Sequence, residues 1–329
     1  MEPSPRSVER RWQMDESLAK VGADLLKTCM GLKRGESLLV VTDLPTREIG
    51  EALFQGGTDA GANAMLMVIL PTGKNGAEPP TAVAAAMKQA DVVVCPTKFS
   101  VTHTRARLEA AKAGARIATM PGITEEMFFK GAVSADYAAV ADLSRRGTDL
   151  LSKARDARIV KDGKELTMSL EGRDAVASTG LYTEKGQSGN LPTGEAYIAP
   201  IEGTASGETV FDGSIAGIGP LKMPVTVKLE KGLLVNADGP DGKRLLEMLG
   251  DAEEARNLGE LGVGTNDRAR ITGVILEDEK VYGTVHLAFG DNSTFGGNTR
   301  AGVHIDGIIM KPDLYLDGKL VVSGGKLLI

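Results

Sequence analysis

Apolar and polar positions alternate along the first half of the chain in a way that predicts short strands separated by helices. Apolar runs bounded by turn-forming residues are typical of buried strands, and apolar positions three to four residues apart are typical of amphipathic helices. A regular succession of the two predicts a parallel sheet with helical crossovers. We expect buried strands at residues 37–42, 63–70, 91–96 and 116–121, and helices at 46–61, 79–90, 102–113 and 135–154.

The pattern changes after residue 154, where short alternating segments are separated by two-residue turns. Asp-Gly or Lys-Gly pairs at 162–163, 231–232 and 317–318 each lie between two such segments. This arrangement is a strong signal for β-hairpins. Only residues 241–258 show a helical pattern in this half of the chain.

The length and composition agree with two globular domains. The chain has 329 residues, of which 42% are apolar and 25% charged, and a single hydrophobic core rarely grows to this size. We predict an α/β protein with a doubly wound, Rossmann-like parallel-sheet domain at 1–154 and a mainly antiparallel, β-rich α+β domain at 155–329. Because Asp43-Leu-Pro-Thr-Arg-Glu follows the first strand in place of a glycine-rich phosphate loop, NAD binding through that motif is not expected.

The charge, apolar pattern and cysteine content argue against several classes of protein. Lys and Arg number 38 against 44 Asp and Glu, a net charge of −6, and the scattered basic residues disfavour a nucleic-acid partner. The longest apolar stretch, 64–70, is too short to cross a bilayer, and residues 1–11 lack the apolar segment of a secretory signal. Cys29 and Cys95 form no CxxC motif. We expect a cytoplasmic protein that binds a small molecule and neither nucleic acid nor membrane.

Two of the three histidines lie in the second half, in segments that suit a metal site. His304 and Asp306 occupy alternate positions of a predicted strand, so their side chains point to one face. An imidazole and a carboxylate placed in this way form half of a divalent-metal site. His286 lies on an apolar strand. The alternatives are a surface charge pair at 304 and 306, and a core histidine at 286 bonded to a carbonyl.

Two glutamates complete the candidate set. Glu260 lies between small and apolar residues directly after the predicted helix 241–258, and a buried carboxylate there needs a partner such as a metal. Glu195 opens a short apolar strand bounded by prolines. A solvated edge position and an exposed turn are the respective alternatives. The whole set exceeds what one catalytic zinc takes and suits two ions about 3.5–4 Å apart.

The segments NLPTGEAYIAP, LGELGVG, GTVHLAFG and HID, in this order, resemble the metal-binding motifs of the metallo-aminopeptidases of the aminopeptidase T and S type. The resemblance covers about residues 155–329 and extends more weakly over the N-terminal domain. It implies a homodimeric hydrolase, a metalloprotease that releases N-terminal residues from short peptides by attack of a metal-bound hydroxide, with Glu195 or Glu260 as a catalytic carboxylate. The implied ligands of two divalent ions, zinc, cobalt or manganese, are Glu195, Glu260, His286, His304 and Asp306.

A related branch offers the alternative. The chain resembles the mononuclear Fe(II)-dependent 2,5-dihydroxypyridine dioxygenases in its size and in Ser100-Val-Thr-His-Thr-Arg105. By this resemblance His103 lies near the substrate; a surface position at a helix N-terminus is its other interpretation. That branch has a histidine where this chain has Glu260, and it lacks counterparts of Glu195 and His286. The peptidases, in turn, have a catalytic tyrosine where this chain has Asp291-Asn292.

The main hypothesis is therefore a dinuclear metallo-aminopeptidase, and the alternative is a ring-cleaving dioxygenase. A binding or assembly protein with a degenerate site is a third, non-enzymatic hypothesis. Elemental analysis separates them, because nearly two ions per chain favour the hydrolase and nearly one iron favours the dioxygenase. The substrate and the identity of the metal are not encoded in these patterns.

Overall fold

The computed structural model describes residues 16–329, which form two compact units. The first comprises the chain up to Tyr137 together with Gly180–Pro192, and the second comprises Ala138–Thr179 together with Thr193–Ile329. Residues 1–11, where we expected no secretory signal, lie outside the described residues. None of the described helices is both long and apolar enough to cross a membrane.

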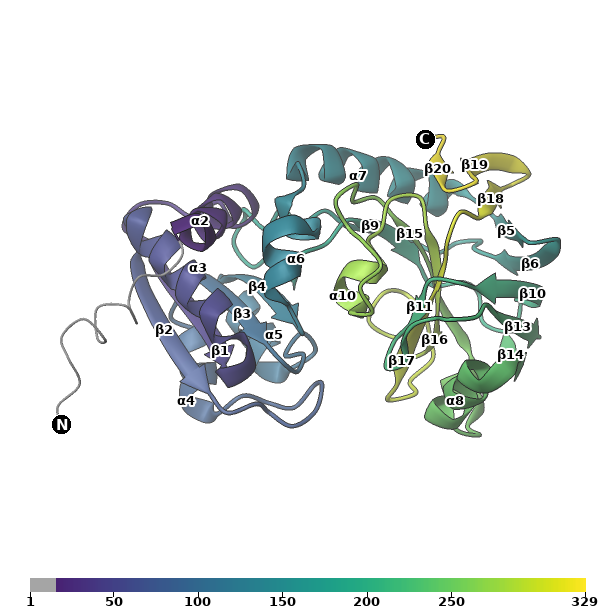
Figure 1. Ribbon diagram of the computed structural model, residues 1–329, viewed down its shortest axis with the longest axis horizontal. Helices are drawn as coiled ribbons and strands as arrows, with labels where there is room; N and C mark the ends of the chain where they lie inside the picture. The colour runs from purple at the N-terminus through teal and green to yellow at the C-terminus, as the bar shows by residue number, and fades with distance from the viewer. Residues whose placement is uncertain (1–15) are drawn as a thin grey trace. The chain divides into compact units, whose positions relative to one another are not determined.

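The first unit contains the predicted parallel sheet (Figure 1). Its strand order is β2-β1-β3-β4-β8. Its strands are β1 (Ser37–Asp43), β2 (Asn63–Ile69), β3 (Val92–Thr97), β4 (Arg116–Pro121) and β8 (Ser188–Asn190). The helices of this unit are α2 (Glu16–Met30), α3 (Arg47–Asp59), α4 (Thr81–Met87), α5 (Arg105–Lys112) and α6 (Glu125–Lys130), with short 3-10 turns η1 (Leu44–Thr46) and η2 (Ala132–Ser134).

Helices cover both faces of this sheet. Alternate residues of each strand point to opposite faces, so apolar side chains on each face pack against the helices there. In β1, Leu39 and Val41 join an apolar cluster with residues of α4 and α5. Leu38 packs on the other side, against Gly57 of α3 and near Leu26 of α2. The first unit is therefore doubly wound.

Two strands of the first unit differ from expectation. The apolar strand β2 is not buried, since it forms the edge of the sheet and leaves 44% of Met65 and 45% of Val68 exposed. The chain also returns from the second unit to add β8, which pairs in parallel with β4. The apolar pattern does not reveal β8, because its sequence is Ser-Gly-Asn.

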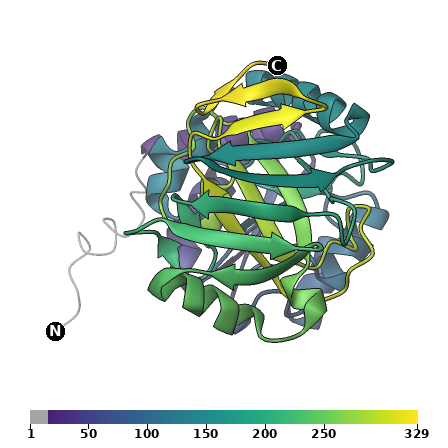
Figure 2. The same ribbon diagram turned by 90° about the vertical axis from the view of Figure 1, so that its right-hand side faces the viewer.

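Two antiparallel sheets form the second unit. Figure 2 shows the strands of the larger sheet lying one above another, with those of the second sheet running steeply behind them. Their facing sides share one core, in which the rings of Phe211 and Phe289 lie 6.2 Å apart. The eight-stranded sheet has the order β14-β13-β10-β6-β5-β18-β19-β20, and the seven-stranded sheet has the order β12-β11-β17-β16-β15-β9-β7.

The larger sheet consists of β5 (Asp156–Lys161), β6 (Lys164–Ser169), β10 (Ser206–Phe211), β13 (Val225–Glu230), β14 (Leu233–Ala237), β18 (Asp313–Leu316), β19 (Lys319–Ser323) and β20 (Lys326–Leu327). The second consists of β7 (Val176–Ser178), β9 (Glu195–Ile198), β11 (Ser214–Ile215), β12 (Gly219–Pro220), β15 (Leu258–Gly264), β16 (Val285–Gly290) and β17 (His304–Ile309). The helices of this unit are α7 (Tyr137–Lys153), α8 (Gly239–Leu249), α9 (Glu253–Arg256) and α10 (Ile275–Asp278).

All three predicted hairpins are present in the larger sheet. The first turn residue, Asp162, Lys231 or Asp317, has φ of 48–49°, and the glycine after it has φ of 73–79°. Two successive positive φ angles define the turn that matches the right-handed twist of paired strands. The Asp-Gly and Lys-Gly pairs therefore set the strand ends.

Two predictions about the second half are corrected. The expected helix 241–258 is two helices, because Gly250 ends α8 at φ 72°, and the chain is already in strand β15 at Leu258. The boundary between the units also lies at residue 138 rather than near 154. Leu151 of α7 and Ala154 pack into the core of the second unit, so this helix belongs there.

Candidate metal centre

Neighbouring strands of the seven-stranded sheet bring the candidate ligands onto one face. Residues paired across antiparallel strands, and residues two positions apart on one strand, point to the same side. Glu260 of β15 pairs with Ala288 of β16, which pairs with Asp306 of β17. The same register places on this face Glu195, opposite Gly264, His286, opposite Gly262, and His304, opposite Gly290.

The opposite face of these strands is apolar and packs into the core of the second unit. Leu261, Leu287 and Phe289 point into the core shared with the larger sheet. Glu260 is 6% exposed, so the interpretation as a solvated edge residue is wrong. Glu195 is likewise 6% exposed, which rules out an exposed turn position.

Gly262 leaves the space that the His286 ring occupies. A Cβ atom at position 262 would lie 2.0 Å from Nε2 of His286. Without it, the imidazole extends across β15 and reaches carboxylates on both sides. Its Nε2 lies 3.2 Å from Oε1 of Glu260 and 3.4 Å from Oε2 of Glu195.

Glu260, His304 and Asp306 form the first of two groups, with ligand atoms within 4.8 Å of one another. His304 Nε2 lies 3.4 Å from Oε2 of Glu260 and 3.6 Å from Oδ1 of Asp306. The other ring nitrogen, Nδ1, is 2.8 Å from the carbonyl oxygen of Asp291 and donates to it in the matching tautomer. This bond directs Nε2 toward the carboxylates, as in many metal-binding histidines.

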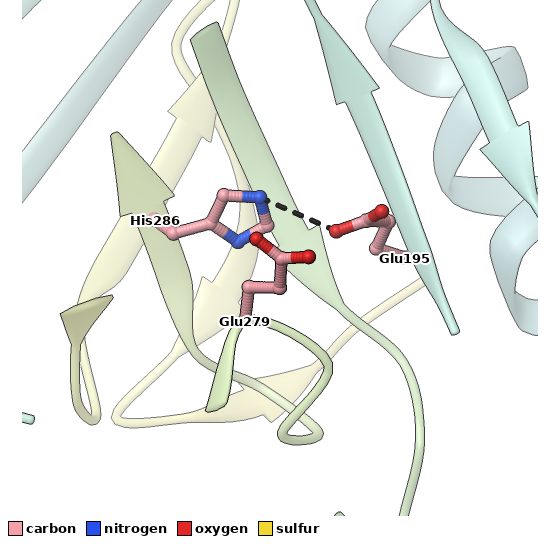
Figure 3. A group of neighbouring side chains, drawn as sticks. All are labelled: Glu195, Glu279 and His286. Carbon is pink, nitrogen blue, oxygen red and sulfur yellow. Dashed lines mark ion pairs between the residues drawn. The ribbon is translucent and has the colours of Figure 1, made fainter. Parts of the chain in front are cut away.

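Glu195, Glu279 and His286 form the second group (Figure 3), also within 4.8 Å. The three side chains point toward one another from β9, from the residue after α10, and from β16. Because Glu260 contacts both His286 and His304, the two groups are adjacent.

Sequence analysis missed Glu279 of this second group and Lys280, which pairs with it. The Lys280 ammonium is 1% exposed, donates to Oε1 of Glu195 at 2.6 Å, and pairs with Glu279 as well. The run Glu277-Asp278-Glu279-Lys280 is typical of an exposed loop, yet Glu277, Asp278 and Lys280 are buried. Only the short spacing to His286 could have indicated a place in the site.

Burial and close ion pairing shift the pKa values of several side chains in these two groups, which together we call the cluster. Burial alone would raise the pKa of Glu260, but hydrogen bonds from His286 and His304 hold it well below its usual range. Burial would lower the pKa of His286, yet the bond to Glu260 and the charge of Glu195 raise it to about 9. The pKa of His304 rises in the same way beside Asp306 and Glu260. Protonated imidazoles thus balance the carboxylates beside them when no metal ion is bound.

The pKa values of Glu279 and Lys280, at the second group, are shifted as well. Burial raises the pKa of Glu279 to about 8, an effect that Lys280 partly opposes and Glu195 reinforces. Burial would lower the pKa of Lys280, but the charges of Glu195 and Glu279 more than compensate and raise it.

The donor set fits a divalent cation. Imidazole nitrogens and carboxylate oxygens suit zinc, manganese or ferrous iron. Within the described chain, three buried polar atoms of the cluster make no hydrogen bond, namely Glu195 Oε2, His286 Nδ1 and Asp306 Oδ1. Buried polar atoms are normally satisfied, and Asp306 Oδ1 in particular faces the Glu260–His304 pair.

The remaining candidates lie outside the two groups. His103 belongs to the first unit, is exposed, and immediately precedes Thr104, which caps α5. Asn292 is buried and ties the segment between β16 and β17 together, since it donates to Glu202 and accepts from the backbone of Thr299. It therefore has a structural role at the position where the peptidases have a tyrosine.

Comparison with known proteins finds a family that matches most of the chain. Residues 18–329 match the family of 2,5-dihydroxypyridine 5,6-dioxygenase. A 2,5-dihydroxypyridine 5,6-dioxygenase of Pseudomonas putida is 26% identical over 197 residues, which cover 54% of this chain and 55% of that protein. The aligned part thus spans about half the length of this curated relative.

Solved structures show the same fold. The 2,5-dihydroxypyridine dioxygenase of P. putida KT2440 superposes with a TM-score of 0.78 at 21% identity, over 94% of this chain and 96% of that one. AmpT from Thermus thermophilus gives 0.70 at 18% identity, over 96% and 100%. Both likenesses concern the fold.

The family match corrects the main functional hypothesis. Hydrolase, aminopeptidase and metalloprotease are the wrong class, because the matching family and the curated relative are dioxygenases. The divalent-metal site remains consistent with both the donor set and this family. With a match over residues 18–329, the chain belongs to the 2,5-dihydroxypyridine 5,6-dioxygenase family.

Proposed function

We propose that the protein is a ring-cleaving dioxygenase that uses Fe(II) and acts on a 2,5-dihydroxypyridine or a closely related dihydroxylated ring. The observation that carries this proposal is the group of Glu260, His304 and Asp306 on one sheet face in a chain of this family. The matched curated relative is itself named for this reaction.

Glu260, His304 and Asp306 are the proposed ligands of the ion. This set has one imidazole and two carboxylates, so it departs from the two-histidine set of the related branch. It remains a nitrogen and oxygen set that suits ferrous iron. When bound, the iron supplies the one-electron chemistry that allows dioxygen to react with an aromatic ring.

The surrounding residues position these ligands and control protons. The carbonyl of Asp291 holds the His304 ring, and Glu260 is fixed between the two imidazoles. His286, with a pKa of about 9, holds a proton beside Glu260 near neutral pH. We propose that this proton is available to a hydroxyl oxygen of the substrate. Roles of Glu195 as a catalytic carboxylate and of His103 in substrate binding stay predictions.

Oxygen uptake tests the proposal. Protein reconstituted anaerobically with Fe(II) should consume dioxygen on addition of 2,5-dihydroxypyridine. Asp306→Asn should abolish this uptake, because it removes a ligand charge with little change in shape. Asp251→Asn, at a fully exposed site, is the matched control and should retain it. Iron-loaded wild-type protein that consumes no dioxygen with dihydroxypyridines or catechols would refute the proposal.

A further inference from the structure

The two acidic groups differ in one respect: only the Glu195–Glu279–His286 group is paired with a lysine. Lys280 pairs with both carboxylates of the Glu195 group, namely Glu195 and Glu279. In the part of the chain described, neither Lys nor Arg pairs with Glu260 or Asp306, whose ion-pair partners are histidines.

The ammonium group of Lys280 is buried and ion-paired. Its side chain is 1% exposed, and Oε1 of Glu195 accepts a hydrogen bond of 2.6 Å from Nζ. A buried ammonium is retained only where paired carboxylates offset its lost hydration. The ammonium lies between two acidic side chains, Glu195 and Glu279, so it is held in place by both.

An ammonium in this position also opposes a second metal ion. It occupies Oε1 of Glu195 and Oε1 of Glu279, which leaves one oxygen of each carboxylate for a metal at this group. Repulsion between an ammonium and a divalent ion grows with the product of their charges and is strong at short range in a buried site. Buried atoms without a hydrogen bond occur in both groups, namely Glu195 Oε2, His286 Nδ1 and Asp306 Oδ1, so the difference between the groups is the ammonium itself.

We propose that the Lys280 ammonium is the resident cation of the Glu195–Glu279–His286 group and confines divalent-metal binding to a single ion at Glu260, His304 and Asp306. The inference rests on the metal-dependent function proposed above. It assigns to Lys280 a positioning role that fixes the number of ions.

Equilibrium dialysis with Mn(II), followed by elemental analysis and by electron paramagnetic resonance of the bound ions, tests this inference. Wild-type protein should bind one ion and Asp306→Asn none. Lys280→Met, similar in length and uncharged, should bind two ions that show spin coupling. Lys280→Arg, which keeps the charge, should again bind one.

The outcomes separate this inference from the proposed function. Wild-type protein without any bound ion would refute the metal-dependent function itself. Two ions in wild type, one ion in Lys280→Met, or an ion retained in Asp306→Asn would overturn the role of Lys280 and leave the metal dependence standing. If Lys280→Met folds only with excess Mn(II) and then holds two ions, the role is supported. Failure of Mn(II) to restore its fold would contradict it.

Discussion

At the residue scale, Gly262 determines where His286 lies. Gly262→Ala should displace the ring, because the added Cβ would meet Nε2 at 2.0 Å. We expect the variant to lose about 1–3 kcal/mol of stability and at least about ten-fold in metal affinity. Calorimetric titration with Mn(II) and denaturant unfolding measure the two effects.

Leu261→Val is the matched control for this prediction. Leu261 neighbours Gly262 but points into the core, so shortening it should cost about 1 kcal/mol without changing metal affinity. Equal metal affinity in Gly262→Ala and wild type would show that the position of His286 is unimportant for the site.

The raised pKa of His304 predicts that metal binding depends on pH. Its ring is protonated near neutral pH in the metal-free protein, and a metal ligand must lose that proton. Proton and metal therefore compete, so the apparent affinity should fall as the pH falls from 8 to 6. Titration at pH 7 in buffers of different ionisation enthalpy should reveal release of about one proton or more per ion. Binding without proton release would contradict the pairing described for His304.

At the scale of elements, Glu202 anchors the segment between β16 and β17, which precedes His304. Its Oε1 accepts bonds from Asn292 Nδ2 at 3.0 Å and from the Asn298 amide at 2.7 Å, and Oε2 pairs with Arg173. Glu202→Ala leaves these partners unsatisfied, so we expect a loss of about 2–4 kcal/mol in unfolding free energy.

Glu208→Ala provides the comparison, since Glu208 is 40% exposed and pairs with the partly exposed Lys164. That change should cost at most about 1 kcal/mol. Equal losses in the two variants, measured by urea unfolding, would mean that Glu202 does not anchor the segment.

Elements defined by local chemistry could be predicted from the sequence, and those defined by distant pairing could not. The hairpin at Asp162 follows from the backbone angles that Asp-Gly adopts. The edge position of β2 depends on which strands pair, and its apolar composition alone suggested burial. For β8 the determinant is pairing with β4, some seventy residues away, rather than any apolar pattern of its own.

The same distinction holds for the site. Alternation along a strand placed His304 beside Asp306, and the Gly-rich surroundings of Glu260 and His286 marked further ligands. Glu279 and Lys280 were missed because a charged run normally lies in solvent, and only tertiary packing buries it. Their distance in sequence from Glu195 conceals the ion pair that joins them.

At the scale of the whole molecule, the homodimer implied by the resemblance stays a prediction. Light scattering after size-exclusion chromatography should give about 69 kDa, twice the mass of the 34.5 kDa chain, since closed two-fold dimers are the commonest assembly. A mass equal to one chain at micromolar concentration would contradict it.

The proposed function requires that this site couple a divalent ion to dioxygen chemistry. Mass spectrometry of the product formed from 2,5-dihydroxypyridine under ¹⁸O-labelled dioxygen tests it most directly. Iron-loaded wild-type protein should place both atoms of the labelled dioxygen in the ring-opened product, and Asp306→Asn should form no product. A product that contains oxygen only from water, or only one atom from dioxygen, would contradict it.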